Sequence, residues 1–270
     1  MRIWTRTAQV AAVIILSAQS SVGKDQKDVV EAAQDAQIVI LGEVHDNPHH
    51  HMAQAAAVAA LRPNAVVWEM LTPDQAALLT PTTLAEPRAL ADLLDWDASG
   101  WPDFFLYLPI FEAAAQAQHF GAAVPREVAR AAMEAGLSQA FGGDAARFGL
   151  DAPLPEAEQT AREADQLAAH CDALPVEMLP AMVDIQRLRD ARLAQVALQA
   201  KEEAGGLVAI ITGNGHARRD RGVPVYLLTA DPTLRIFSLG QAEEGVVQGQ
   251  FDMVLDAAAV DRPDPCAAFR

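Results

Sequence analysis

The sequence predicts an α/β protein with a mostly parallel central sheet, flanking helices and a helical insertion. Two short, continuous apolar runs, Ile38 to Leu41 and Ala65 to Trp68, are typical of buried parallel strands. The helix expected between them, at about residues 48–61, completes a β-α-β unit, and such a unit favours parallel strands. A third apolar run, Leu207 to Thr212, resumes the pattern far along the chain.

The helix expected at residues 48–61 has signals at both of its ends. Asn47 can cap the first turn, Pro48 suits the first helical position, and Pro63 stops the helix. The segment after the second strand is mostly helical in pattern, and we place a helical insertion at about residues 72–204. The expected helices span residues 86–94, 109–119, 127–140, 158–171 and 176–204, and the remaining expected strands span residues 122–124, 225–229, 234–239 and 251–255.

The N-terminal segment is typical of an export signal. Arg2 and Arg6 form a positively charged start, and the apolar segment at residues 11–18 is too short to cross a bilayer. We therefore expect residues 1–22 to be a signal peptide, residues 23–270 to form one domain in the periplasm, and the mature protein to have no stable membrane span. The alternative is that the N-terminal segment is a buried first helix.

The chain carries a strong negative charge. Its 270 residues include 20 Lys and Arg against 36 Asp and Glu, which gives a formal net charge of −16. A surface of this charge repels nucleic acid, so we expect no nucleic-acid partner. An anionic ligand would need locally concentrated positive charge, and the clearest concentration is formed by Arg218, Arg219 and Arg221.

Cysteine is rare in this chain. Cys171 and Cys266 are the only two. In an oxidising compartment such a pair either forms a disulfide or remains as two independent buried thiols, and the sequence leaves both open.

Two turns with the pattern G-x-x-H each follow a predicted strand. Gly42 to His45 follows the first strand, and Gly213 to His216 follows the third. Glu69 ends the second strand. In open α/β sheets the carboxyl ends of parallel strands meet at one edge, and ligands bind there. We therefore expect a cluster at this edge, composed of Glu43, His45, Glu69 and His216.

The residue types in this cluster carry chemistry. Imidazoles and carboxylates bind divalent metals, and near neutral pH they also act as general acids and bases. The structural alternative is that each histidine only caps its turn by a hydrogen bond to the backbone. His49, His50 and His51 begin the next helix; consecutive residues point in different directions, so all three cannot reach one ligand, and they are alternatively a solvated helix end.

Three common functional motifs are missing from the sequence. The stretch G-N-G-H-A-R has Arg218 where a dinucleotide fingerprint needs its third glycine. The sequence also contains neither the G-x-S-x-G elbow of serine hydrolases nor a P-loop. These observations exclude the corresponding classes of site.

Several segments, in order along the chain, resemble one known family. The opening stretch I-L-G-E-V-H-D-N-P-H-H-H, residues 40–51, resembles the first motif of ChaN-like haem-binding uptake proteins, within the wider Tiki group. This resemblance extends to residue 224 and is therefore more specific than either G-x-x-H turn. The further matching segments are W-E-M at 68–70, W-P-D-F-F-L-Y-L-P-I at 101–110, A-A-V-P-R at 122–126, H-C at 170–171, M-V-D-I-Q-R-L-R-D-A at 182–191 and G-N-G-H-A-R-R-D-R-G-V-P at 213–224.

The resemblance implies iron acquisition by haem binding, with haem held at the interface of a homodimer and a tyrosine on the iron. Tyr107 lies in a matching segment and is the candidate ligand; alternatively it is a buried aromatic residue whose hydroxyl has a protein partner. Haem propionates need nearby positive charge because unpaired buried carboxylates are costly. The other candidate haem contacts are His45, His216, Arg218 and Arg219, although these arginines could instead balance nearby acids.

The wider group also contains metal-dependent peptidases and esterase-like hydrolases, so the second hypothesis is an enzyme. Glu43 would activate water, and a divalent metal would be held by Glu43, His45 and His216, with Glu69 in the same catalytic cluster. A Soret band on haem addition favours the binding protein, whereas a stoichiometric metal with hydrolytic turnover favours the enzyme. The third possibility is a scaffold that keeps these turns for structure alone.

Overall fold

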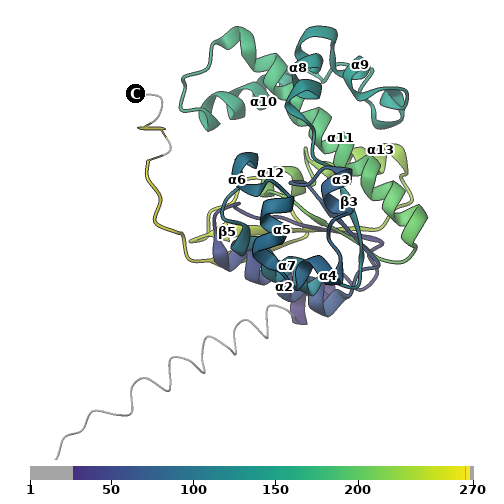
Figure 1. Ribbon diagram of the computed structural model, residues 1–270. Helices are drawn as coiled ribbons and strands as arrows, with labels where there is room; N and C mark the ends of the chain where they lie inside the picture. The colour runs from purple at the N-terminus through teal and green to yellow at the C-terminus, as the bar shows by residue number, and fades with distance from the viewer. Residues whose placement is uncertain (1–26, 265, 268–270) are drawn as a thin grey trace, which may run out of the picture.

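A computed structural model of the chain describes residues 27–264, 266 and 267. The predicted signal peptide, residues 1–22, lies outside this range. Six strands of the described part form one sheet in the order β3-β2-β4-β1-β5-β6, and every neighbouring pair is parallel (Figure 1). The prediction of an α/β fold is confirmed. The strands are β1 (Ile38–Leu41), β2 (Ala65–Trp68), β3 (Gln118–Gly121), β4 (Val208–Ile211), β5 (Ile236–Glu243) and β6 (Met253–Ala257).

The three central strands β2, β4 and β1 are buried along their whole length. They are continuous apolar runs because helices cover both faces of the sheet. Leu41, at the end of β1, pairs with Ile211 of β4, which pairs in turn with Trp68 of β2. The turns that follow these strands therefore leave the sheet side by side.

One face of the sheet is covered by helices from the first half of the chain. The helix α2 (Pro48–Leu61) begins at the expected cap, where the Asn47 side chain accepts a hydrogen bond from the backbone of His49. The helix α7 (Phe104–Ala113) packs against α2 and contributes Phe111 to the core. Short helices precede α7 and extend this layer: α3 (Pro73–Ala76), α4 (Pro81–Leu84), α5 (Pro87–Leu93) and α6 (Trp96–Ser99).

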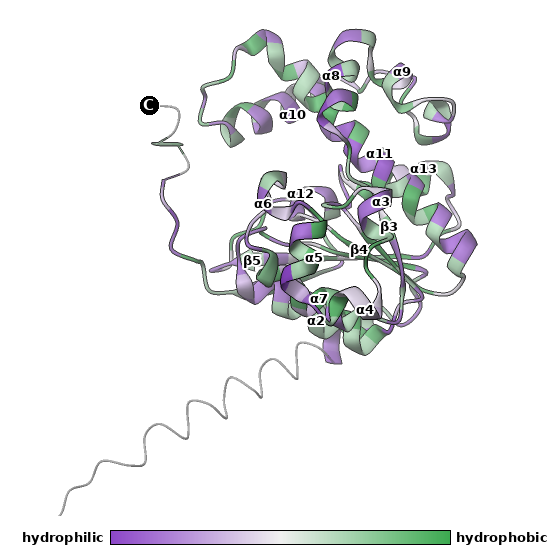
Figure 2. Cartoon of the chain, viewed as in Figure 1, coloured by the Kyte–Doolittle hydropathy of each residue, from purple (hydrophilic) through white to green (hydrophobic). Residues whose placement is uncertain are grey.

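The other face is covered by the long helix α11 (Leu179–Ala204) and by α13 (Val223–Ala230). Three further helices project beyond the carboxyl ends of the strands, where they form the upper layer of Figure 1. Hydrophobic residues gather in the strands, while these projecting helices carry both hydrophilic and hydrophobic residues (Figure 2). The projecting helices are α8 (Arg126–Ala135), α9 (Leu137–Phe141) and α10 (Glu156–Ala169); the single turn η1 (Ala145–Phe148) lies between α9 and α10, and η2 (Val176–Met178) lies between α10 and α11.

Two of the expected strands differ in the structure. The segment at residues 225–229 lies inside α13, because Pro224 opens a helix there and Leu227 packs in the core beneath α11. A five-residue apolar run does not by itself distinguish a strand from a buried helix. The strand expected at residues 122–124 lies earlier, as β3, because α7 ends at Ala113. Thus β3 joins the sheet from within the range expected to be a helical insertion.

The C-terminal segment is bonded both to the projecting helices and to residues near the sheet. Cys266 forms a disulfide with Cys171, just after α10, and this resolves the alternative left open by the sequence. Closer to the sheet, the Arg262 guanidinium donates hydrogen bonds to Asp46 and Glu243 at 2.6–2.7 Å. Among the described helices, none is both long and apolar enough to cross a membrane.

Candidate functional site

The predicted site residues leave the sheet from three neighbouring strands. Glu43 and His45 follow β1, Glu69 follows β2, and His216 lies in the single turn α12 (Asn214–Ala217) after β4. Because β4 pairs with both β1 and β2, these turns are adjacent at the carboxyl edge of the sheet.

Glu43 is buried and holds the His45 ring. Its Oε1 atom accepts a hydrogen bond from the Tyr107 hydroxyl at 2.9 Å and lies 2.8 Å from Nδ1 of His45. A carboxylate oxygen accepts, so Nδ1 of His45 is the atom that donates. Nε2 of His45 is then a free acceptor, and this is the arrangement in which a carboxylate orients an imidazole that binds a metal.

His45 is the exposed member of this group, with 41% of its side chain accessible. Its ring stands edge-on to Trp101, with the ring centroids 4.7 Å apart. A Cβ atom placed on Gly213 would lie 3.0 Å from Nε2 of His45, so the glycine leaves room for the ring. Burial lowers the pKa of His45, but the hydrogen bond to Glu43 and the charge of Glu69 outweigh it, and the pKa lies above its usual value.

His216 has a different environment. Its Nδ1 lies 2.7 Å from Asp190, on α11, and its Nε2 lies 3.4 Å from Glu69. Burial lowers the pKa of His216, but these two carboxylates outweigh burial and raise the pKa to about 10. At neutral pH His216 is therefore an imidazolium, and an imidazolium has no lone pair to offer a metal.

Glu69 is held by the turn that follows β4. Its Oε2 atom accepts hydrogen bonds from the Thr212 hydroxyl at 2.6 Å and from the backbone N–H of Gly213 at 2.8 Å. Burial would raise the pKa of Glu69, but the neighbouring His216 and these hydrogen bonds hold it below its usual value. Glu69 thus forms an ion pair with His216 and holds the turn after β4 against the turn after β2.

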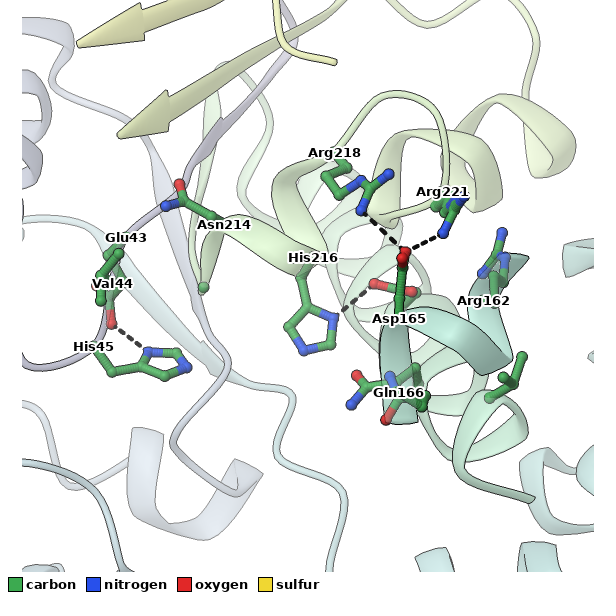
Figure 3. A pocket seen from close by; sticks show the side chains of 15 residues that line it. Glu43, Val44, His45, Arg162, Asp165, Gln166, Asn214, His216, Arg218 and Arg221 are labelled. Atoms are coloured by element: carbon green, nitrogen blue, oxygen red, sulfur yellow. Dashed lines mark hydrogen bonds and ion pairs between the residues drawn. The ribbon is translucent and has the colours of Figure 1, made fainter. Parts of the chain in front are cut away.

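Two clefts meet at His45. The smaller, with a volume of about 430 Å³, lies between the strand turns and helices α10 and α11, and Glu43, His45 and His216 line it. The rings of His45 and His216 stand on opposite sides of this cleft (Figure 3). The larger, of about 830 Å³, is lined by His45 and Glu69 together with other polar residues and with apolar ones, among them Met70, Trp101, Pro102, Val124 and Leu193.

Tyr107 is completely buried beneath this site. Its hydroxyl donates to Glu43, and its ring stands edge-on to His51 at a centroid distance of 4.3 Å. Burial and the charge of Glu43 raise the pKa of Tyr107 above its usual range, so the phenol is neutral. The role of Tyr107 as an iron ligand stays a prediction, and it requires the hydroxyl to leave Glu43.

The predicted arginines are already paired with acids. Arg218 lines the smaller cleft but makes two hydrogen bonds to Asp220, at 2.6 and 3.1 Å. Arg219 lines neither cleft; it donates to Asp252 and to the backbone of Ile236. Both arginines therefore have acidic partners among the described residues, and their role as haem contacts stays a prediction.

The consecutive histidines mainly hold the strand turn. Nδ1 of His50 accepts a hydrogen bond from the backbone N–H of Val44 at 2.9 Å, and its Nε2 lies 3.2 Å from the carbonyl of Ala242. Nε2 of His51 lies 2.7 Å from the carbonyl of His45. His50 and His51 are buried and position the G-x-x-H turn, whereas His49 is exposed.

Sequence reasoning missed Asp190, although a signal for it exists. On α11 the buried residues Val183, Ala194 and Ala197 recur at helical spacing, and Asp190 falls on the same stripe. A carboxylate on the buried face of a helix requires a partner, and here His216 provides it.

A family model described as haem-binding uptake, Tiki superfamily, ChaN matches residues 29–227. The chain belongs to this family. A solved structure of ChaN of Campylobacter jejuni with cofacially bound haem shares 18% sequence identity, covers 84% of this chain and 90% of its own, and superposes with a TM-score of 0.59. At this identity the likeness shows the fold alone.

A second solved structure, the type III effector HopBA1, shares 13% identity over 87% of this chain and 93% of its own. Its TM-score of 0.47 is too low to support an argument. No curated protein sequence matches the chain.

The geometry gives the divalent-metal hypothesis no support. Within residues 27–264, 266 and 267, no group of three or more His, Cys, Asp or Glu is arranged to hold a metal ion. Of the predicted ligands, His216 is paired on both ring nitrogens, and Glu43 accepts from Tyr107 and His45 through Oε1, whereas its buried Oε2 has no hydrogen-bond partner among the described residues.

Proposed function

We propose that this member of the haem-binding uptake family binds haem at the carboxyl edge of its sheet, with Nε2 of His45 on the iron. One observation carries the proposal. His45 has an imidazole nitrogen without a hydrogen-bond partner in the described part of the chain, oriented by a buried carboxylate and placed where two clefts meet. Haem iron accepts an imidazole ligand, so the donor fits the group.

The residues around His45 have distinct tasks in this proposal. Haem supplies an iron that binds a basic nitrogen. Glu43 fixes the tautomer of the neutral His45 ring so that Nε2 carries the lone pair, Trp101 packs against the ring, and Gly213 leaves space beside it. The protonated His216 places a positive charge across the smaller cleft.

Tyr107 is the iron ligand that the family resemblance implies. Substitutions of Tyr107 and His45 distinguish the two candidate iron ligands. His45→Ala should weaken haem binding strongly and shift the Soret band in an absorption titration of the purified protein. Tyr107→Phe removes only a hydroxyl and should leave the band in place if His45 holds the iron. A band displaced by Tyr107→Phe and unchanged by His45→Ala would assign the iron to Tyr107.

The control for this titration is His49→Ala. His49 is exposed and lines neither cleft, so its replacement should leave both affinity and spectrum unchanged. A wild-type protein that gives no haem spectrum at micromolar concentration contradicts the proposal, and hydrolytic turnover with a stoichiometric divalent metal would then support the enzyme.

The setting that we propose for this activity is haem uptake in the periplasm, after removal of residues 1–22. The n-region and apolar segment of the sequence support export. Mass spectrometry of periplasmic protein should find a new N-terminus between about residues 18 and 25, as signal cleavage requires. An intact Met1 in a cytosolic fraction contradicts export. Gel filtration with and without haem tests the homodimer that the family resemblance implies.

A further inference from the structure

Two arginines line the larger cleft. Arg126 opens α8 and Arg189 lies on α11, and both line the cleft that His45 borders. Within the described part of the chain, neither guanidinium makes a hydrogen bond or an ion pair. Arg189 is half-buried, so its charge is partly removed from water without a compensating carboxylate.

The arginines of the smaller cleft are different. Arg162 donates to Glu158 on its own helix, Arg218 to Asp220, and Arg221 to Asp165. Every described arginine that lines the smaller cleft is thus paired with an acid, whereas among the described residues Arg126 and Arg189 in the larger cleft are not. The acids that line the larger cleft are already engaged: Asp46 binds Arg262, and Glu69 binds the turn after β4.

The rest of the larger cleft suits a flat apolar ligand. Trp101, Pro102 and Met70 line it together with Val124 and Leu193. Its volume of about 830 Å³ falls within the range of about 300–1,000 Å³ that is usual for small-molecule and cofactor sites. Apolar lining residues together with two guanidinium groups suit a molecule that has both an apolar body and carboxylate groups.

We infer that Arg126 and Arg189 bind the carboxylates of the ligand in the larger cleft. Arginine suits this task because its planar fork donates two parallel hydrogen bonds to one carboxylate. The inference rests on the proposed function, in which the ligand is haem and its carboxylates are the propionates. It adds to the earlier candidates Arg218 and Arg219, which already donate hydrogen bonds to Asp220, and to Asp252 and the carbonyl of Ile236.

A metal-free porphyrin tests this pair separately from the iron ligand. Protoporphyrin IX keeps both carboxylates but has no iron, so its binding does not need His45; quenching of its fluorescence measures the affinity. Replacing both Arg126 and Arg189 by Gln should weaken binding of the diacid roughly tenfold or more, since charged hydrogen bonds are lost. Binding of the dimethyl ester, in which both carboxylates are neutral, should not change.

Matched controls lie on the same two helices. Arg130, on α8, is exposed and lines neither cleft, and Arg192, on α11, is bonded to Gln195. Arg130→Gln and Arg192→Gln should leave diacid binding unchanged, and Arg189→Lys should retain part of it because the charge remains.

The outcomes separate the two proposals. The assignment of Arg126 and Arg189 as carboxylate ligands is overturned if their replacement weakens binding of the diacid and of the diester equally. It is also overturned if the wild-type protein binds both porphyrins with equal affinity. If haem still gives a His45-dependent spectrum in that case, the proposed function stands without the pair. If the diacid binds through the two arginines but His45→Ala leaves the haem spectrum unchanged, the pair stands and the iron ligand is wrong.

Discussion

The hydroxyl of Tyr107 and Nδ1 of His45 share one acceptor, the Oε1 atom of Glu43, at 2.9 and 2.8 Å. Tyr107 comes from α7 and His45 from the turn after β1, so the carboxylate connects the buried face of α7 to the residue at which the two clefts meet. Protonation or deprotonation of His45 therefore changes the charge beside the Glu43 carboxylate, which Tyr107 holds in place.

Haem binding through His45 should weaken as the pH falls. Protonation occupies Nε2, and the raised pKa of His45 means that binding is lost at a higher pH than about 6.5, the usual value for histidine.

Glu43→Gln removes the largest contribution that raises this pKa, so the loss of haem binding should shift to lower pH. The same variant should bind haem roughly 10- to 100-fold more weakly at neutral pH, because the ring is no longer oriented. A Soret titration between pH 5 and 9, at about one-unit steps, measures both effects; an unchanged midpoint in Glu43→Gln would falsify this role of Glu43.

The ion cluster of His216 should make stability depend on pH. The pKa of His216 is raised to about 10 in the folded protein, whereas an unfolded histidine titrates near about 6.5. The stabilisation is therefore complete below about pH 6.5 and is lost as the pH rises to about 10. His216→Gln leaves two buried carboxylates without their cation and should lower the free energy of unfolding by roughly 3–5 kcal/mol at pH 6.

The difference in the free energy of unfolding between wild type and His216→Gln should be smaller at pH 10 than at pH 6. Urea unfolding at both pH values measures it. Taking the difference cancels the titration of groups that do not interact with His216, and leaves that of His216 with its neighbours Glu69 and Asp190. His49→Gln, at an exposed histidine, serves as the control and should show no difference at either pH. A His216 difference of equal size at both pH values would mean that the imidazole is neutral in the folded protein.

The disulfide should stabilise the protein substantially. Cys171 and Cys266 are 95 residues apart in sequence, so their bond restricts a long loop of the unfolded chain, an effect of roughly 2–4 kcal/mol. Replacing both cysteines by Ser, or adding a reducing agent, should lower the melting temperature by several degrees. Because the chain has no other cysteine, the reducing agent should have no effect on the double variant. A reductant that leaves the wild-type melting temperature unchanged contradicts the prediction.

The sequence could predict the arrangement of the strand ends because that arrangement depends on local patterns. The apolar runs before Gly42 and Gly213 identify parallel strands, and parallel strands bring their carboxyl ends to one edge. This places Glu43, His45 and His216 near one another without knowledge of any side-chain contact.

The partners of these side chains could not be predicted in the same way, because they depend on how distant helices pack. Asp190 reaches His216 only because α11 crosses the carboxyl edge of the sheet, and the sequence separation of 26 residues does not reveal this. The pairing of Arg218 with Asp220, two positions away, was visible in the sequence as neighbouring opposite charges. What the sequence does not show is that Arg126 and Arg189 remain free.

Gly213 offers a test of the His45 geometry that leaves the backbone unstrained. Its φ of −67° is one that alanine adopts readily, and its N–H would still donate to Glu69. The added Cβ would lie 2.9 Å from Cε1 and 3.0 Å from Nε2 of His45, so the ring must shift. Gly213→Ala should therefore weaken haem binding and alter the Soret band while the melting temperature changes little. Gly215→Ala is the size-matched comparison: Gly215 lines the smaller cleft, but no atom lies within 4 Å of its added Cβ, so the His45 ring need not move. Equal haem affinities for Gly213→Ala and Gly215→Ala would show that the iron does not depend on the position of the His45 ring.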